Sequence, residues 1–188
     1  MPVSVLDENV ALLAVDFQIA TTGRPAAHDI DGVIAAGVRL AEAFRAARLP
    51  VVVARADLNA PPIGRTVHSR LRPPIPESEL AIVPAIGPRP GDWLIGRRAW
   101  SPFAGTDLDA RLRSLGVVQV VFAGLATSFG IESGVRAAYD LGYHVVVATD
   151  AITDPFADRH DYAVSAVFPI LAELGTSEEI ASLLAARG

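Results

Sequence analysis

Five short apolar runs, each rich in valine, isoleucine or leucine, constrain the fold of this chain more than any other feature of its sequence. They span residues 10–17, 50–55, 93–97, 118–123 and 143–149. Their apolar residues are continuous rather than alternating, which is the pattern of parallel strands covered on both faces. The runs therefore predict a largely parallel sheet with helices on each side.

Helical patterns lie between the apolar runs. Residues 30–44 carry apolar side chains at helical spacing, and a second helix is expected to open at Thr106 and to stop at Gly116. Three more helices are predicted over residues 131–141, 158–174 and 177–186. Because alternating strands and helices are typical of a doubly wound α/β fold, we expect a single domain over residues 1–188.

Residues 59–91 interrupt this alternation with eight prolines. A stretch of this length without regular structure is uncommon inside a compact domain and is usually functional or disordered. It follows the second expected strand, at the edge where ligands bind in sheets of this kind. We expect it to form either an ordered lid or pocket wall, or a plain surface excursion.

The composition removes several kinds of chemistry. The chain has no cysteine and all 16 of its Lys and Arg residues are arginines, so neither a thiolate nor a lysine amine can act as nucleophile or base. The formal charge of −5 and the lack of a basic stretch with interleaved aromatics argue against nucleic acid as a partner. No apolar stretch reaches about 18 residues and the N-terminus lacks a signal-peptide pattern, so we expect a cytoplasmic protein that does not bind or span membranes.

Candidate catalytic side chains follow the ends of predicted strands. Asp16 ends an apolar strand, where partial desolvation would raise the pKa of its carboxyl group and suit it to acid or base work. The alternative for Asp16, and for Asp150 after a later strand, is a capping role. Arg97 and Arg98 point to opposite faces of the sheet, so only one can reach a site there, and it would either bind a carboxylate or phosphate or lie solvated.

A tight turn joins the fourth run to the next helix near Gly130. Such a turn places backbone amides and a helix N-terminus at the carboxyl edge of the sheet, where an oxyanion can be held. The turn also has a purely structural explanation, as a tight connection between a strand and a helix.

Metal and cofactor motifs are missing from the sequence. The histidines at 28, 68, 144 and 160 lack the spacings of known metal motifs, and Asp57, Asn59 and His68 are the nearest set of conceivable ligands. Neither a Gly-x-Gly-x-x-Gly sequence nor a phosphate-binding Gly-x₄-Gly-Lys-Ser/Thr loop is present. We therefore predict a protein that uses neither a metal nor a nucleotide cofactor.

Three segments together resemble the isochorismatase-like (cysteine hydrolase) superfamily. They are residues 14–18 (Ala-Val-Asp-Phe-Gln), 97–109 (Arg-Arg-Ala-Trp-Ser-Pro-Phe-Ala-Gly-Thr-Asp-Leu-Asp) and 123–154, which begins Ala-Gly-Leu-Ala-Thr-Ser-Phe-Gly. Their order and spacing match that superfamily over residues 10–176. The resemblance implies a three-layer α/β/α sandwich with a mainly parallel, doubly wound six-stranded sheet, in a protein that forms homodimers or larger homo-oligomers.

The resemblance also implies a catalytic site. Amidase members carry aspartate, lysine and cysteine at positions that match Asp16, Arg97 and Gly130, and their cis peptide would fall at Leu125–Ala126. Members that hydrolyse isochorismate resemble this chain in having glycine instead of cysteine. They protonate an enol ether through the aspartate, and the missing thiol makes room for a bulkier substrate. By the same resemblance, the substrate would contact Gln18, Arg65, Trp100, Leu125, Ala126 and Phe129.

Arg97 leaves two hypotheses open. An arginine cannot shuttle a proton, and beside Asp16 it would lower the carboxyl pKa that a general acid needs raised. It would either grip a substrate carboxylate, leaving Asp16 free, or close the site as an ion pair. The first predicts a hydrolase of a small anionic substrate, acting by enol ether hydrolysis or a related acid–base reaction in specialised metabolism. The second predicts a non-catalytic small-molecule-binding or assembly protein of the same fold.

Overall fold

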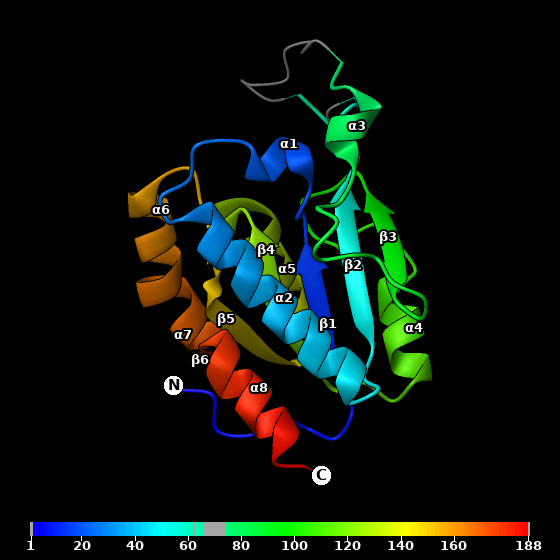
Figure 1. The fold of residues 1–188 in the computed structure, drawn as a ribbon, viewed down its shortest axis with the longest axis vertical. Helices are drawn as coiled ribbons and strands as arrows, with labels where there is room; N and C mark the ends of the chain where they lie inside the picture. Colours follow the sequence, from blue (N-terminus) through cyan, green and yellow to red (C-terminus); the bar gives the residue numbers. More distant parts are fainter. Residues whose placement is uncertain (1, 62, 66–73, 188) are drawn as a thin grey trace.

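A six-stranded sheet forms the centre of the computed structural model, which describes residues 2–61, 63–65 and 74–187. The strand order is β3-β2-β1-β4-β5-β6, and every neighbouring pair is parallel (Figure 1). The strands are β1 (Val10–Val15), β2 (Val51–Ala56), β3 (Trp93–Arg97), β4 (Gln119–Leu125), β5 (His144–Thr153) and β6 (Glu173–Gly175). The predicted parallel α/β sheet is confirmed, and each of the five apolar runs forms one of its strands.

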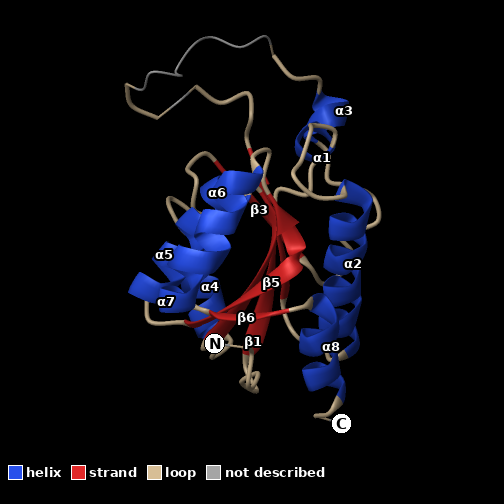
Figure 2. Ribbon diagram, turned by 90° about the vertical axis from the view of Figure 1, so that its left-hand side faces the viewer, coloured by secondary structure: helices blue, strands red, loops and turns tan. Residues whose placement is uncertain are grey.

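Helices cover both faces of the sheet, which confirms the three-layer α/β/α sandwich (Figure 2). One face is covered by α2 (Ile30–Ala46) and α8 (Ser177–Ala185), and the other by α4 (Leu108–Ser114), α5 (Glu132–Asp140), α6 (Ala157–Tyr162) and α7 (Phe168–Leu171). The shorter elements are α1 (Ile19–Thr22), α3 (Glu77–Leu80) and two π-helical turns, η1 (Thr127–Ile131) and η2 (Ala163–Val167). Within the described ranges, no helix has the length and apolar character needed to span a bilayer.

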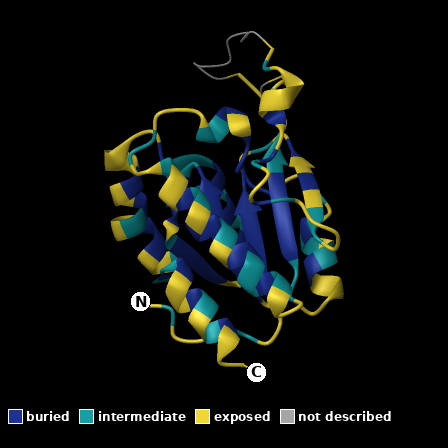
Figure 3. Cartoon of the chain, in the orientation of Figure 1, coloured by how far each residue is buried: buried dark blue, intermediate teal, exposed yellow. Residues whose placement is uncertain are grey.

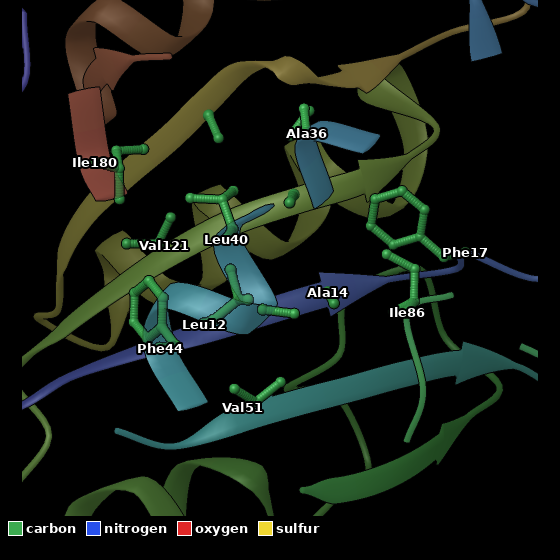
Figure 4. Close-up of a cluster of buried hydrophobic side chains, with 14 of the residues drawn as sticks. Leu12, Ala14, Phe17, Ala36, Leu40, Phe44, Val51, Ile86, Val121 and Ile180 are labelled. Atoms are coloured by element: carbon green, nitrogen blue, oxygen red, sulfur yellow. The ribbon is translucent and has the colours of Figure 1, made fainter. Parts of the chain in front are cut away.

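Each face of the sheet has its own apolar core, as expected for strands covered on both sides. Leu12, Leu40 and Phe44 are fully buried in the core beneath α2 and α8 (Figure 4), and Phe122 and Phe168 are fully buried in the other. The central strands β1 and β4 are buried along their whole length, whereas the edge strands β3 and β6 are only partly buried (Figure 3). Burial of each large apolar side chain stabilises the fold by about 1.5–3 kcal/mol.

The helix predicted over residues 158–174 is wrong in its last part. The chain is helical through α6, η2 and α7, but the helix ends at Leu171 and Ala172 has an extended backbone. The next residues form the edge strand β6, which pairs with β5 through Val146↔Glu173. A three-residue edge strand has too little periodicity to distinguish it from the end of a helix, so its pairing with β5 decides its structure.

Two other predicted boundaries differ from the structure. The helix expected to open at Thr106 begins at Leu108, with Asp107 at the N-cap position and without a side-chain cap from that residue. The Thr106 hydroxyl donates to the Pro102 carbonyl oxygen (2.6 Å) and accepts from the Leu108 amide (3.4 Å). The strand expected to end at residue 149 continues to Thr153, and its last residues pair with the end of β4.

Part of the proline-rich stretch is built into the fold. Residues 77–80 form α3, and Ile86 is fully buried in the same core as Phe17. The side-chain amide of Asn59 donates to the Ile75 carbonyl oxygen (2.9 Å) and accepts from the Ile75 amide (2.8 Å), so it joins the two ends of the loop between them. A lid over residues 62 and 66–73 lies outside the described residues.

Candidate active site

Asp16, Arg97 and Gly130 meet at the carboxyl edge of the sheet. Asp16 directly follows β1, Arg97 is the last residue of β3, and Gly130 lies in η1 after β4. This edge is where parallel α/β sheets bind their ligands, because the strands end there together and their connecting loops converge. The structure therefore brings the three predicted catalytic positions into one place.

The side chains of Asp16 and Arg97 form a buried ion pair. Nη2 of Arg97 donates to Oδ2 of Asp16, and Nη1 donates to the Ala99 carbonyl oxygen. The Arg97 side chain is 2% exposed and the Asp16 side chain 9%, so water screens neither charge. Asp16 has a φ of 53°, an uncommon backbone conformation that aspartate tolerates better than most residues. The ion pair considered from the sequence is thus present.

One atom of each partner in this pair has no hydrogen-bond partner. These atoms are Oδ1 of Asp16 and Nε of Arg97, and across the part of the chain that the structure describes they are the only buried side-chain nitrogen or oxygen atoms of this kind. An unpaired buried polar atom costs about 1–3 kcal/mol, so native proteins keep few of them. Unused hydrogen-bonding capacity is therefore concentrated at one point of the molecule.

Burial raises the pKa of the Asp16 carboxyl group to about 6. The positive charge of Arg97 and the nearby backbone of Ala56 lower this pKa, but burial outweighs both. Burial also lowers the pKa of Arg97, against the opposing effect of Asp16. Arg97 does lower the pKa of Asp16, as expected, but the desolvation that was also expected for Asp16 outweighs this effect. The carboxyl group therefore titrates in the range that suits a general acid or base.

Arg97 also fills the space beside Gly130. A Cβ atom on Gly130 would lie 2.8 Å from Nη2 of Arg97 and 3.2 Å from the Leu125 carbonyl oxygen. The first distance is shorter than real Cβ atoms show, so any side chain at position 130 requires Arg97 to move. In this structure the guanidinium group occupies the room that the missing side chain leaves, so a bulkier substrate could use that room only if Arg97 moved.

The turn that carries Gly130 begins with the cis peptide bond that the resemblance placed at Leu125–Ala126. Leu125 is buried and Ala126 half-buried. Several amides of the turn already have acceptors. The Phe129 and Ile131 amides donate to the Ala126 carbonyl oxygen at 3.0 and 3.3 Å, and the Ser128 amide donates to Asp154. The turn therefore offers fewer free donors to an oxyanion than its sequence suggests.

The Gln18 side chain lies in the protein interior, where it joins two backbone segments by hydrogen bonds, and does not line the pocket. It is fully buried, and its side-chain amide donates to the carbonyl oxygens of Ala56 (3.1 Å) and Leu80 (2.9 Å). Its carbonyl oxygen accepts from the Ala56 amide (2.8 Å). The predicted contact with substrate is not supported, because these bonds to the backbone occupy the side chain.

The remaining predicted substrate contacts are on the surface. Arg65 is exposed in the loop between β2 and α3. Trp100 is 62% exposed and stacks on the half-buried ring of Phe129, with centroids 4.9 Å apart. Phe129 directly precedes Gly130 in η1, whereas no observation brings Arg65 to the ion pair.

A pocket of about 440 Å³ opens beside Arg97. Its charged lining is mixed, with Arg97 joined by Arg55, Arg98, Asp57 and Glu77. Arg97 is buried and Arg98 exposed, yet both line this pocket, so the expectation that only one of them could reach a site here is wrong for the pocket. Asp16 is not among the residues that line this pocket.

Two parts of this arrangement were missed at the sequence level. Arg55 and Glu77 belong to the pocket, and the only signal for Arg55 was its place at the end of the second apolar run. Asp57 lines the same pocket, but His68 lies outside the described residues. Among the residues that the structure does describe, no group of three or more histidines, cysteines, aspartates and glutamates is arranged to hold a metal ion.

Comparisons with known proteins agree on one family. The model of the isochorismatase domain matches residues 10–179. The isochorismatase family protein YecD of Escherichia coli O157:H7 is 30% identical over 94% of this chain and 97% of its own. A solved isochorismatase family protein from Burkholderia thailandensis has a TM-score of 0.88 at 34% identity, covering 96% of this chain and 98% of that one. The ureidoacrylate amidohydrolase RutB of Agrobacterium fabrum is 40% identical over 39% of this chain and 32% of its own.

Proposed function

Because this chain belongs to the isochorismatase family of hydrolases, we propose that it hydrolyses a small anionic substrate without a covalent nucleophile, using Asp16 as the general acid. The observation that carries the proposal is the buried Asp16–Arg97 pair, which holds the unpaired atoms Oδ1 and Nε. With a pKa raised to about 6, the carboxyl group can carry a proton near neutral pH.

In this proposal, Arg97 binds the anionic group of the substrate. Its Nε and Nη2 hydrogens point along one edge of the planar guanidinium group, and a carboxylate can accept from both at once. A substrate carboxylate that enters from the neighbouring pocket would compete with Oδ2 of Asp16 for Nη2 and would use Nε, which is otherwise unpaired. Substrate binding would then offset the charge that lowers the pKa of Asp16, and the carboxyl group would take up a proton.

The most concrete reaction for such a site is the hydrolysis of an enol ether. Asp16 transfers its proton to the terminal vinyl carbon, and the adjacent carbon becomes an oxocarbenium ion. Water adds to that carbon, and the resulting hemiketal breaks down to a ketone and an alcohol, while the proton lost by water returns to the carboxylate. Neither a thiol nor a metal takes part in these steps.

Amide hydrolysis by a cysteine nucleophile is not proposed for this chain. RutB is named as an amidohydrolase, but its similarity extends over only part of this chain. The chain has no cysteine, and the space beside Gly130 is filled by Arg97.

A second candidate function is non-catalytic binding or assembly, and one observation favours it. Asp16 does not line the pocket, and its Oδ2 atom is bonded to Nη2 of Arg97. If this ion pair never opens, the carboxyl group cannot reach a substrate, and the pocket would bind small molecules without converting them.

Pyruvate release from isochorismate by the purified protein tests the proposal, with Asp16→Asn measured beside it. The matched control is Asp140→Asn, which makes the same change at the exposed end of α5. We expect release by the wild type and by Asp140→Asn, and a loss of about 10²-fold or more in Asp16→Asn. Equal release by all three proteins would remove Asp16 from the mechanism. No release by the wild type, together with isochorismate binding that does not depend on Asp16, would favour the non-catalytic function.

A further inference from the structure

Two adjoining residues of the η1 turn, Thr127 and Ser128, are hydrogen-bonded to one segment of the chain, residues 154–160. The Thr127 hydroxyl is hydrogen-bonded to Nδ1 of His160 (2.9 Å). A carboxylate oxygen of Asp154 accepts from both the amide (2.8 Å) and the hydroxyl (2.7 Å) of Ser128. Thr127, Asp154 and His160 are all buried. The turn that carries Gly130 is therefore fastened at two successive residues, two and three positions before the glycine.

The segment that holds the turn is itself held by the loop before α2. Nδ1 of His28 is hydrogen-bonded to the hydroxyl of Thr153 (3.0 Å), and the Ala27 amide donates to the Asp154 carbonyl oxygen (2.8 Å). The rings of His28 and His160 lie with their centroids 4.4 Å apart at an angle of 58°. A continuous set of contacts thus leads from the loop before α2, through the end of β5 and the start of α6, to the η1 turn.

Charge determines which form of His160 this arrangement holds. Burial lowers the pKa of His160, the neighbouring His28 lowers it further, and Asp161 and Asp154 oppose the shift. At neutral pH the ring is therefore uncharged, and a single hydrogen bond joins Nδ1 to the Thr127 hydroxyl. Protonation of the ring would leave a charge in a buried position beside a second histidine.

We propose that His160 is a positioning residue for the candidate active site, which it serves by fixing Thr127 and thus the turn that sets Gly130 against Arg97. The fit at that contact is close, since even a Cβ on Gly130 would fall 2.8 Å from Nη2 of Arg97. A turn that moves would therefore also move the guanidinium group and its bond to Asp16. The predicted effect on catalysis rests on the proposed function, whereas the effect on the turn does not.

The test compares three variants. Thr127→Val removes only the hydroxyl, His160→Leu removes the ring, and His160→Asn keeps a polar atom near the place of Nδ1 but does not titrate near neutral pH. Amide hydrogen exchange of residues 127–131 reports on the turn, and thermal unfolding reports on the whole fold. We expect exchange to be about ten-fold faster in Thr127→Val and His160→Leu, the scale of one lost hydrogen bond, and near wild type in His160→Asn.

Two further readouts separate positioning from general stability. The double variant Thr127→Val/His160→Leu should exchange no faster than either single variant, because both remove the same bond. If the wild type releases pyruvate, kcat should fall about ten-fold in the two disrupting variants with a smaller change in KM, and His160→Asn should restore it. Exchange in folded Thr127→Val that equals wild type would overturn the proposal. If the wild type shows no hydrolysis, the proposed function fails, but the exchange measurement still decides the positioning role.

Discussion

Nη2 of Arg97 lies 2.8 Å from the point that a Cβ atom on Gly130 would occupy. The guanidinium group and the glycine are therefore complementary, because one side chain takes the space that the other lacks. The same nitrogen donates to Asp16, so the contact with Gly130 also determines where the ion pair can form. Substitutions at positions 97 and 130 should therefore be coupled in their effects on stability.

A double-mutant cycle tests this coupling. Gly130→Ala should lower the free energy of unfolding by about 1–3 kcal/mol, as overpacking of a buried site does. Gly130 does not have a positive φ, so this cost would come from the contact with Arg97 rather than from backbone strain. In an Arg97→Lys background the same substitution should cost less, because lysine lacks the planar group that faces the new methyl. Urea unfolding of the four proteins measures the difference. An equal cost in both backgrounds would show that Arg97 is not the obstacle.

The same contact predicts the behaviour of an introduced thiol. Gly130→Cys alone should not create thiol-dependent amide hydrolysis, because the new side chain meets the guanidinium group and no lysine replaces it. Hydrolysis of a carbamate or nicotinamide, measured before and after treatment with iodoacetamide, is the assay. Activity that appears in the variant and is lost on alkylation would contradict this expectation.

The positions of the strands and of the candidate site follow from simple rules. Continuous apolar runs predict a parallel sheet, and residues that end parallel strands meet at one edge, so the proximity of Asp16 and Arg97 was expected. The same rules do not predict how deeply a side chain is buried. The pKa of Asp16 is raised because the loss of water outweighs the charge of Arg97, and the size of that loss depends on the completed fold.

Contacts between distant segments account for the other differences. Gln18 seemed available to a substrate, but α3 and the end of β2 supply the backbone groups that occupy its amide. The polar cluster joins His28, the segment that carries Asp154 and His160, and the η1 turn, which are far apart in the sequence, so no local motif marks it. β6 gains its structure from β5 rather than from its own three residues.

The hydrogen bonds of the Gln18 side chain should contribute to the stability of the fold. Gln18→Leu keeps a similar volume but leaves the carbonyl of Leu80 and both backbone groups of Ala56 without their side-chain partners. Each buried group that loses its partner costs about 1–3 kcal/mol, so we expect a clear fall in the unfolding midpoint. Chemical denaturation of the variant, beside the exposed control Asp140→Asn, provides the measurement. An unchanged midpoint would mean that these bonds contribute little to stability.

Stability should depend on pH through Asp16. Its pKa is about 6 in the folded protein and 3.8 in a model compound, so between these values the folded state binds more protons than the unfolded state. The free energy of unfolding contributed by this group therefore falls as the pH rises through that window, by about 3 kcal/mol at most. Asp16→Asn should lack this slope, apart from a constant offset for the unpaired Arg97. Urea unfolding from pH 4 to pH 7 compares the two proteins, and parallel curves would contradict the raised pKa.

Activity should also depend on the protonation of Asp16, with a direction that identifies its role. A general acid acts in its protonated form, so kcat/KM should fall about ten-fold per pH unit above an apparent pKa near 6. A general base would give the opposite slope below that pKa.

Binding of a non-reactive anionic analogue near pH 7 should be accompanied by proton uptake, because the analogue would offset the charge of Arg97. Calorimetry in two buffers with different ionisation enthalpies measures this uptake. Tight binding with no proton uptake would mean that Asp16 stays ionised beside Arg97, and would turn the assignment toward the non-catalytic function.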